Sequence, residues 1–505
     1  MNGMDAKTLS VLDAGFEGLL IEIECHMSNG LPNIVVVGFA NKAVDESKER
    51  IRSAFATSGL MLPKKRITIN LAPADIPKES TSLDLGIAAT ILKAGSLVRC
   101  IQQDVVIIGE LGLDGAVKPV RGIIGKLLTA KNNGNTSIIL PEANLSQANL
   151  VEGVNLYPVK TLKELYELLL APLSKPQSTK ISYKKIPQNS SQTSFKDIVG
   201  QPFAKRALEI AAAGNHNVLL SGPPGTGKSM LAKALISILP DPTVDEMIQI
   251  THLHSLSSNN FDDVITARPF RSPHHSSSDT SIIGGGRNPK PGEISLAHRG
   301  VLLFDEFPEY RRSALEGLRQ PLEDSAITVA RAKGTVTYPA DFLFVATANP
   351  CPCGFYGSTK VCTCLPTQIM KYQKKMSGPI IDRIDIFAEV NQTPHARLLD
   401  TSNEENSSAI RNRVANARLK QQRRFRSSRT NSTMSNKDIK KHAVLDSSAK
   451  TMLDTAAERM HLSSRGYMRT IKIARTIADL DNSDNISTKH LAEALQYRKK
   501  PLANP

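Results

Sequence analysis

The residue pattern with the clearest chemistry is Gly222-x-x-x-x-Gly227-Lys228-Ser229, which lies in the run NVLLSGPPGTGKSML. The apolar residues before it predict a buried strand, and the residues after it begin a helix whose dipole favours an anion. The glycines let backbone N–H groups turn inward around a phosphate. Lys228 would supply positive charge to the β- and γ-phosphates, and the Ser229 hydroxyl would bind Mg²⁺. The predicted nucleotide-binding loop consists of Gly222, Pro223, Pro224, Gly225, Thr226, Gly227, Lys228 and Ser229.

A second chemical pattern is the apolar run from Val301 to Phe304, which Asp305 and Glu306 follow directly. Such a run is typical of a buried parallel strand, and ligands bind at the carboxyl ends of these strands. Asp305 would complete the Mg²⁺ shell, and Glu306 would polarise the attacking water. A strand that ends in an acidic surface turn is the alternative. Together with the glycine-rich loop, the pair predicts hydrolysis of a nucleoside triphosphate.

Four closely spaced cysteines, Cys351, Cys353, Cys362 and Cys364, form a third pattern. Four thiolates can close a tetrahedral Zn²⁺ site, although C-x-C is a tighter spacing than the usual C-x-x-C. A structural zinc site is therefore one interpretation. Reduced thiols without a ligand and a redox-active pair are the two others.

The chain that must position these residues has 505 amino acids, which is room for about three domains. Its apolar fraction of 40% is enough for ordinary cores. No apolar run reaches the length of about 18 residues that a membrane span needs. The N-terminal residues lack the basic-then-apolar pattern of a signal peptide. We therefore expect a cytoplasmic protein that does not enter the membrane.

The formal net charge of +15 favours a polyanionic partner such as nucleic acid. The chain has no Trp, and aromatic residues make up only 5% of it. Platforms for base stacking are therefore expected to be few, and contacts with nucleic acid would be mainly to the backbone. The stretch 411–429 contains no acidic residue, and it is either a solvated helix face or part of a nucleic-acid surface.

Apolar periodicity and linker composition predict a multidomain α/β protein. Residues 1–170 alternate strands with helices, including apolar runs at 33–38, 105–109 and 137–140 and a helical pattern at 40–58. Residues 171–194 are rich in Ser, Pro, Lys and Gln and read as a linker. An α/β core at 195–392 and a helical region at 393–505 follow. An insert in the core contains His274 and His275, and it fits a mobile basic loop better than a metal site.

The run RPFRSPHH, the glycines at 284–286 and PKPGEISLAHRGVLLFDEFPEY resemble the YifB/ComM family of magnesium-chelatase-like AAA+ ATPases along nearly the whole chain. The resemblance implies ATP and Mg²⁺ as ligands and assembly into a ring, most simply a hexamer. It implies that Ile198 and Val199 contact the adenine and that Asn349 is the sensor-1 residue. Arg383 resembles the arginine finger that acts on a neighbouring subunit, and a salt-bridged helix end is the alternative. Arg465 resembles the sensor-2 residue of a helical lid, and Arg469 is the second candidate for that role. Each nucleotide would then lie between the core and lid of one subunit.

The stretch 109–144 also resembles the Lon protease domain, whose catalysis uses a serine and a lysine. Lys126 stands at the lysine position, whereas Asp84 stands where the serine is expected. A carboxylate cannot replace the serine nucleophile, so the resemblance implies a Lon-like α+β domain without proteolytic activity.

The family resemblance implies a DNA motor that drives branch migration during recombination of incoming single-stranded DNA. Single-stranded or branched DNA would be its partner. Alternating β-branched residues around Lys333 predict a hairpin, whose tip residues Arg331 and Lys333 would contact phosphates in the pore of the ring. A solvated turn is the alternative for this hairpin. Two other functions stay open for the whole protein, namely a protein-remodelling ATPase and a subunit of a magnesium chelatase.

Overall fold

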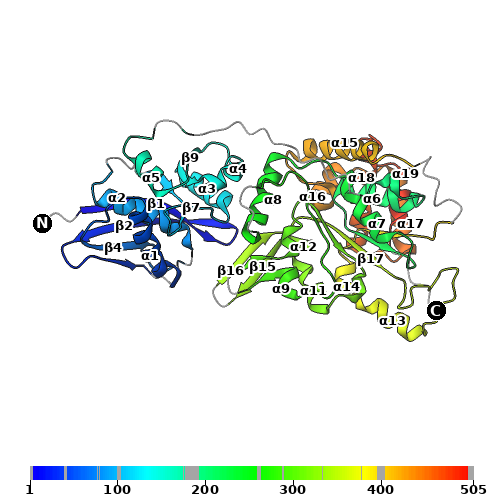
Figure 1. Cartoon of the computed structure of the whole chain (residues 1–505). Helices are drawn as coiled ribbons and strands as arrows, with labels where there is room; N and C mark the ends of the chain where they lie inside the picture. Colours follow the sequence, from blue (N-terminus) through cyan, green and yellow to red (C-terminus); the bar gives the residue numbers. More distant parts are fainter. Residues whose placement is uncertain are drawn as a thin grey trace. The chain divides into compact units, whose positions relative to one another are not determined.

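The computed structural model describes residues 4–38, 42–76, 78, 80–98, 104–173, 176, 193–258, 263–286, 289–331, 334–376, 378–394 and 404–498. Most of the predicted linker, Lys333 and the side chain of Arg331 lie outside this description. The chain divides into two compact units (Figure 1). Unit 1 contains residues 1–184, 243–266 and 334–337, and unit 2 contains the remainder. The sequence-based boundaries assign 243–266 to the core, whereas the structure groups this segment with unit 1.

Unit 1 is built on a seven-stranded mixed sheet of order β3-β4-β2-β1-β5-β8-β9. Strands β1 (Met4–Ala14) and β2 (Glu17–Ser28) form a long antiparallel pair at its centre. The other strands are β3 (Asn33–Val37), β4 (Arg66–Ala72), β5 (Val105–Ile107), β8 (Ser137–Pro141) and β9 (Asn155–Val159). The predicted strands at 33–38, 105–109 and 137–140 are confirmed as β3, β5 and β8.

Helices cover both faces of this sheet because residues of opposite parity along each strand are apolar. Leu12 on β1 belongs to one buried cluster, whereas its neighbour Val11 belongs to the other. The helices are α1 (Lys42–Thr57), α2 (Asp84–Ala94), α3 (Ile123–Asn132), α4 (Leu145–Ala148), α5 (Leu162–Leu169) and α8 (Val244–Ser257). Ile248 of α8 packs on the cluster that contains Val11.

Unit 2 contains a five-stranded parallel sheet of order β11-β14-β17-β10-β18. Its strands are β11 (Phe270–Arg271), β14 (Val301–Phe304), β17 (Leu343–Ala348), β10 (Val218–Ser221) and β18 (Ile386–Glu389). All residues of β14 and β17 are buried, as their uninterrupted apolar runs predict. A separate hairpin joins β15 (Ala326–Arg331) and β16 (Gly334–Pro339), which confirms the predicted hairpin.

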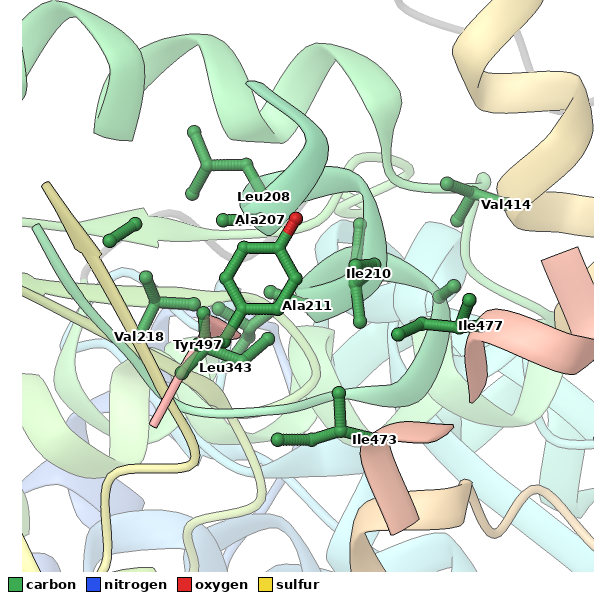
Figure 2. Close-up of a cluster of buried hydrophobic side chains, with 14 of the residues drawn as sticks. Ala207, Leu208, Ile210, Ala211, Val218, Leu343, Val414, Ile473, Ile477 and Tyr497 are labelled. Carbon is green, nitrogen blue, oxygen red and sulfur yellow. The ribbon is translucent and has the colours of Figure 1, made fainter. Parts of the chain in front are cut away.

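The helical region after residue 404 shares one continuous core with this sheet. Figure 2 shows that the Tyr497 ring lies among side chains of α6 (Pro202–Gly214) and the sheet, and that Val414, Ile473 and Ile477 extend the cluster. The helices of this region are α15 (Ser407–Phe425), α16 (Asn436–His442), α17 (Ser447–Arg459), α18 (Ser464–Leu480) and α19 (Thr488–Gln496). A mixed α/β protein with a parallel sheet and a helical C-terminal region is therefore present. Among the helices described, none is both long and apolar enough to cross a membrane.

Candidate nucleotide site

Three adjacent strands of unit 2 end at the same edge of the parallel sheet. The glycine-rich loop follows β10, Asn349 follows β17, and Asp305 follows β14. Since β17 lies between β14 and β10, the sheet order brings these three strand ends together. Asp305 and Lys228 are far apart in the sequence, and the parallel sheet makes them neighbours at this edge.

Close approach and backbone conformation explain the glycines of the loop. A Cβ on Gly222 would lie 2.2 Å from the Val390 carbonyl oxygen, so no larger residue fits there. Gly225 and Gly227 have φ values of +77° and +87°, which L-residues with side chains rarely adopt. The loop then continues into α7 (Lys228–Ala234). The sequence pattern is therefore a direct consequence of the loop geometry.

Lys228 is held by three oxygens at this edge. Its Nζ donates to the carbonyls of Gly222 and Pro223 at 2.8 and 2.7 Å and to Asn349 Oδ1 at 3.1 Å. Burial lowers the pKa of the Lys228 amine, although the nearby Asp305 and Glu306 act in the opposite direction. Phosphate oxygens beside this partly desolvated ammonium would stabilise its charged form.

Ser229 and Asp305 form the second contact of the site. The Ser229 hydroxyl is 3.0 and 2.8 Å from the two carboxylate oxygens of Asp305. Thr347 on β17 adds a contact that the sequence analysis missed, because its hydroxyl donates to Asp305 Oδ1 at 2.5 Å and accepts from the Glu306 N–H. Its place on a buried strand two residues before Asn349 was the available signal. These oxygen ligands suit a hard cation such as Mg²⁺.

Glu306 leaves the strand end in a left-handed conformation with φ of +54°. Its side chain is 60% exposed, and its Oε2 lies 3.9 Å from His275 Nδ1. The His275 ring lies against His274, with centroids 4.1 Å apart, and edge-on to Tyr310. His275 of the insert therefore faces the acidic strand end. In the part of the chain that the structure describes, they belong to no group of metal-ligand geometry.

A cavity of about 1140 Å³ adjoins the glycine-rich loop and has Ser221 and Asn349 in its wall. Gly200, Gln201 and Phe203, which follow the predicted adenine contacts, also line it. Of those predicted contacts, Ile198 is buried in the core of unit 2, and Val199 is half-buried. The residues that follow Val199, rather than Ile198 and Val199 themselves, therefore border the cavity.

The two predicted arginines lie at the opposite edge of the sheet. Arg383 donates to Glu323 and to the Pro379 carbonyl, and its backbone carbonyl accepts from Asn217, the residue before β10. Arg465 lines the same cavity of about 580 Å³ as Arg383. The length of β10, about 13 Å for four residues, separates this edge from the glycine-rich loop. The structure therefore does not bring Arg465 to the nucleotide loop of its own chain, because α18 packs beside the amino ends of the strands.

The arginines of the basic stretch 411–429 differ in their contacts, and the nucleic-acid surface that its sequence allows stays a prediction. Bonds to protein groups hold many of its arginines, namely Arg411, Arg413, Arg418, Arg424 and Arg429. Arg423 and Arg426 are exposed, and neither forms an ion pair with a described residue. They line a cavity of about 520 Å³ with Phe425, Lys441 and His442. We call Arg423, Arg426, Lys441 and His442 the basic cluster.

The four cysteines converge. The four sulfur atoms all lie within 4.8 Å of one another, and none of them is in a disulfide. They belong to Cys351, Cys353, Cys362 and Cys364. Cys351 Sγ lies 3.3 Å from Cys353 Sγ and 3.7 Å from Cys362 Sγ. Thiolates at about 2.3 Å from a tetrahedral zinc ion would be about 3.8 Å apart. The arrangement is therefore compatible with a zinc site.

The two residues at the Lon-like positions lie in separate ion pairs of unit 1. Asp84 accepts from Arg50 Nε and Nη2 at 2.7 and 3.1 Å. Burial raises the pKa of Asp84 to about 6, and Arg50 opposes this rise. Lys126 is buried and binds Asp13 instead, which also accepts from Ser80 at 3.4 Å.

A glycine loop between a strand and a helix, beside an acidic strand end, defines the P-loop class of α/β proteins. Three family models match successive parts of the chain. A model described as magnesium chelatase subunit ChlI matches residues 194–398. A second model, for subunit ChlI of Mg-chelatase, matches residues 23–144, and a third, for the ChlI C-terminal part, matches 404–498.

Relatives that match over nearly their whole length indicate to which family of magnesium-chelatase-like proteins the chain belongs. A competence protein ComM of Haemophilus influenzae is 41% identical over 490 residues, which cover 96% of this chain and 95% of that protein. Protein YifB of Escherichia coli is 40% identical over 484 residues, or 95% of this chain and 94% of the relative. A magnesium-chelatase 67 kDa subunit of Chlorobaculum parvum is 29% identical over only 31% of the chain and 23% of that subunit. The chain belongs to the YifB/ComM family of magnesium-chelatase-like AAA+ proteins.

Proposed function

We propose that this protein is an ATPase that assembles into a ring, most simply a hexamer, and uses ATP hydrolysis to remodel DNA. The ATPase proposal rests on two side-chain contacts that lie together at the carboxyl ends of the strands. Lys228 meets Asn349 there, and Ser229 meets Asp305. Family membership supports ATP and Mg²⁺ as the ligands.

Each residue of this edge has a distinct task in hydrolysis. Lys228 would exchange its contacts with the loop carbonyls for phosphate oxygens, and the glycine-loop N–H groups would hold the same phosphates. Ser229 and Asp305 would hold Mg²⁺, which neutralises phosphate charge when bound. Glu306 would accept a proton from the attacking water, and Asn349 would orient that water. The exposed Glu306 side chain leaves room for the water at the strand end.

The two arginines support a ring because one chain does not contain a complete site. Arg383 and Arg465 share a cavity at the edge away from the glycine loop. We propose that both act on the nucleotide of a neighbouring copy, which corrects the expectation that Arg465 serves its own subunit. A guanidinium beside the γ-phosphate stabilises transition-state charge, worth about 10³- to 10⁵-fold in other NTPases.

DNA is proposed as the partner, with branch migration as the ComM-like activity. Three observations support this choice, namely a relative that is named a competence protein, the net charge of +15 and the basic cluster. The tip residues Arg331 and Lys333 of the β15–β16 hairpin would add phosphate contacts. A protein-remodelling ATPase is the second candidate, since nothing in the phosphate site selects the polymer that the ring moves.

For unit 1 we propose a Lon-like domain without proteolytic activity. Asp84 is committed to Arg50, so it offers no nucleophile. Lys126 is committed to Asp13, and an ion-paired ammonium is a poor general base. The domain boundaries 1–170, 171–194, 195–392 and 393–505 remain part of this proposal.

We propose that the four cysteines bind a structural zinc ion, because their sulfur atoms lie at the spacing that a tetrahedral site requires. Two backbone N–H groups support thiolates rather than neutral thiols as the form that binds. Tyr356 N–H donates to Cys351 Sγ at 3.3 Å, and Cys353 N–H donates to Cys364 Sγ at 3.4 Å. Such second-shell bonds are typical of metal-thiolate sites.

The decisive experiment measures ATP hydrolysis by the purified protein with and without single-stranded and forked DNA, at low and moderate salt. Stimulation that weakens with salt and with Lys333→Ala would support a DNA motor. Glu306→Gln is the control for hydrolysis, and it should bind nucleotide while losing at least about 100-fold in rate. Strong activity that ignores DNA would favour the protein-remodelling alternative.

A further inference from the structure

The four-cysteine segment begins directly at the nucleotide site. Asn349, whose side chain accepts from Lys228 Nζ at 3.1 Å, is separated from Cys351 by a single proline. Cys351 is fully buried. The Pro350 carbonyl accepts from Gln373 Nε2 at 3.0 Å, and Gln373 lies on α13 (Pro366–Lys375), the helix that follows the last cysteine. Both ends of the segment are therefore fastened around the residue that faces Lys228.

The middle of the segment packs directly on the glycine-rich loop. Gly354, between the cysteine pairs, has φ of +85°, and a Cβ there would lie 2.6 Å from Pro224 Cδ. The Gly354 N–H donates to the Cys351 carbonyl at 3.0 Å, which closes the turn that presents this glycine. Pro224 is one of the loop residues expected to surround the phosphates. The turn between Cys351 and Gly354 thus fits against the phosphate loop with no room to spare.

Tyr356 provides a third link. Its backbone N–H donates to Cys351 Sγ, and the residue lines the same cavity of about 1140 Å³ as Ser221 and Asn349. Apolar packing cannot hold the outer part of this segment, because Val361 and Leu365 are 87% and 62% exposed. A loop with so little buried apolar surface needs another cross-link to stay ordered, and a metal ion bound by four thiolates supplies one.

We infer that zinc bound by Cys351, Cys353, Cys362 and Cys364 positions the nucleotide site, so that metal occupancy controls nucleotide affinity. The metal-bound segment presses Gly354 on Pro224 and fixes Asn349 opposite Lys228. The cysteines are positioning residues, since they act through these two contacts. This inference rests on the proposed ATPase function.

The test compares the full-length wild type with three variants. Cys362→Ser removes a ligand. Gly354→Ala keeps all four ligands and disturbs the left-handed turn and its contact with Pro224. Cys25→Ser alters a buried thiol of unit 1 and is the matched control. Zinc per chain is measured by mass spectrometry, and the Kd for a fluorescent ATP analogue by titration. Chelation of zinc from the wild type and its re-addition provide a reversible arm that does not depend on how the variants fold.

We expect about one zinc per wild-type chain, as four thiolates fill one tetrahedral shell. Cys362→Ser should lose zinc, and its nucleotide Kd should rise at least about tenfold, in the range typical of lost supporting contacts. Gly354→Ala should keep zinc yet show a similarly raised Kd, and re-added zinc should restore affinity to the chelated wild type. A wild type that takes up no added zinc, or zinc-free protein with the wild-type Kd, would overturn the inference. A zinc-loaded wild type that binds no nucleotide would instead reject the proposed ATPase function and leave the metal assignment standing.

Discussion

The Ser229 hydroxyl lies 3.0 and 2.8 Å from the two carboxylate oxygens of Asp305, which joins the helix after the glycine loop to the end of β14. Thr347 supports this contact from β17, the strand that lies between β14 and β10. Thr347 donates to Asp305 and accepts from the Glu306 N–H, so one hydroxyl orients both acidic residues. The expected Mg²⁺ ligands are thus aligned by side chains on three separate elements.

Thr347→Val keeps the shape of the side chain and removes this hydroxyl. We expect hydrolysis to fall about 10- to 100-fold and the Mg²⁺ concentration for half-maximal rate to rise, since a second-shell bond to a metal ligand is lost. ATPase rates across a Mg²⁺ titration measure both effects. Thr451→Val on the exposed face of α17 is the matched control. An unchanged Mg²⁺ dependence would show that Thr347 serves the fold alone.

Mixed rings test whether Arg383 acts on a neighbouring subunit. Lys228→Ala should abolish nucleotide binding, and Arg383→Ala should lower hydrolysis about 10³-fold or more. Equal mixtures of the two variants should regain activity, because some intact loops would then face an intact arginine. The ATPase rate is followed after mixing and subunit exchange. Mixtures as inactive as either variant, in rings shown to exchange subunits, would contradict action between subunits.

Substitutions in the basic cluster test whether DNA is the partner of this protein. The double variant Arg423→Ala, Arg426→Ala should weaken DNA binding regardless of sequence and reduce the slope of log K against log salt by about two. Fluorescence anisotropy with labelled single strands at several salt concentrations provides the slope. Lys450→Ala is the control, because it removes one positive charge from an exposed lysine on α17, outside the basic cluster. If both proteins keep the wild-type slope, the cluster does not contact the DNA backbone.

His252 predicts a pH dependence of the stability of unit 1. Its Nε2 lies 2.6 Å from the Phe16 carbonyl oxygen, and its buried Nδ1 has no partner among the described residues. Burial lowers the pKa of this imidazole; the Phe16 carbonyl and Asp13 oppose that shift, and Lys126 reinforces it. The unfolded chain, with an ordinary pKa near 6.5, therefore binds a proton more readily than the folded chain. Above about pH 6.5 the imidazole is neutral in both states, and the fold keeps its full stability at this site. As the pH falls through that value, the unfolded chain gains a proton that the folded chain does not, and the free energy of unfolding decreases.

We expect His252→Gln, which keeps a donor for Phe16 but cannot gain a proton, to flatten this dependence. The wild-type loss would be at most about 1.4 kcal/mol per pH unit for one proton. Thermal unfolding followed by circular dichroism between about pH 7.5 and pH 5.5 measures the difference. Equal slopes for the two proteins would mean that other groups dominate acid unfolding.

Much of the fold followed from local sequence. The apolar runs at 33–38 and 105–109 predicted β3 and β5, since a buried strand leaves a continuous apolar signal. The sequence after Glu306 predicts one helix at about 313–323, whereas the structure has two short helices there, α11 (Arg312–Gly317) and α12 (Arg319–Asp324). A helical pattern indicates which residues are apolar on one face, and it does not indicate the interruption at Leu318 that separates the two helices.

The sequence alone determined the phosphate loop, because spacing within one strand–loop–helix unit fixes which atoms face an anion. The four-cysteine pattern was equally local, and its convergence needed only a tight turn. Tertiary structure decided the partners of separate segments. Sheet order made Thr347 a partner of Asp305, and helix packing set Arg465 beside Arg383 rather than beside the loop. Those outcomes depend on how strands and helices from distant parts of the chain pack, and residue spacing carries no record of that choice.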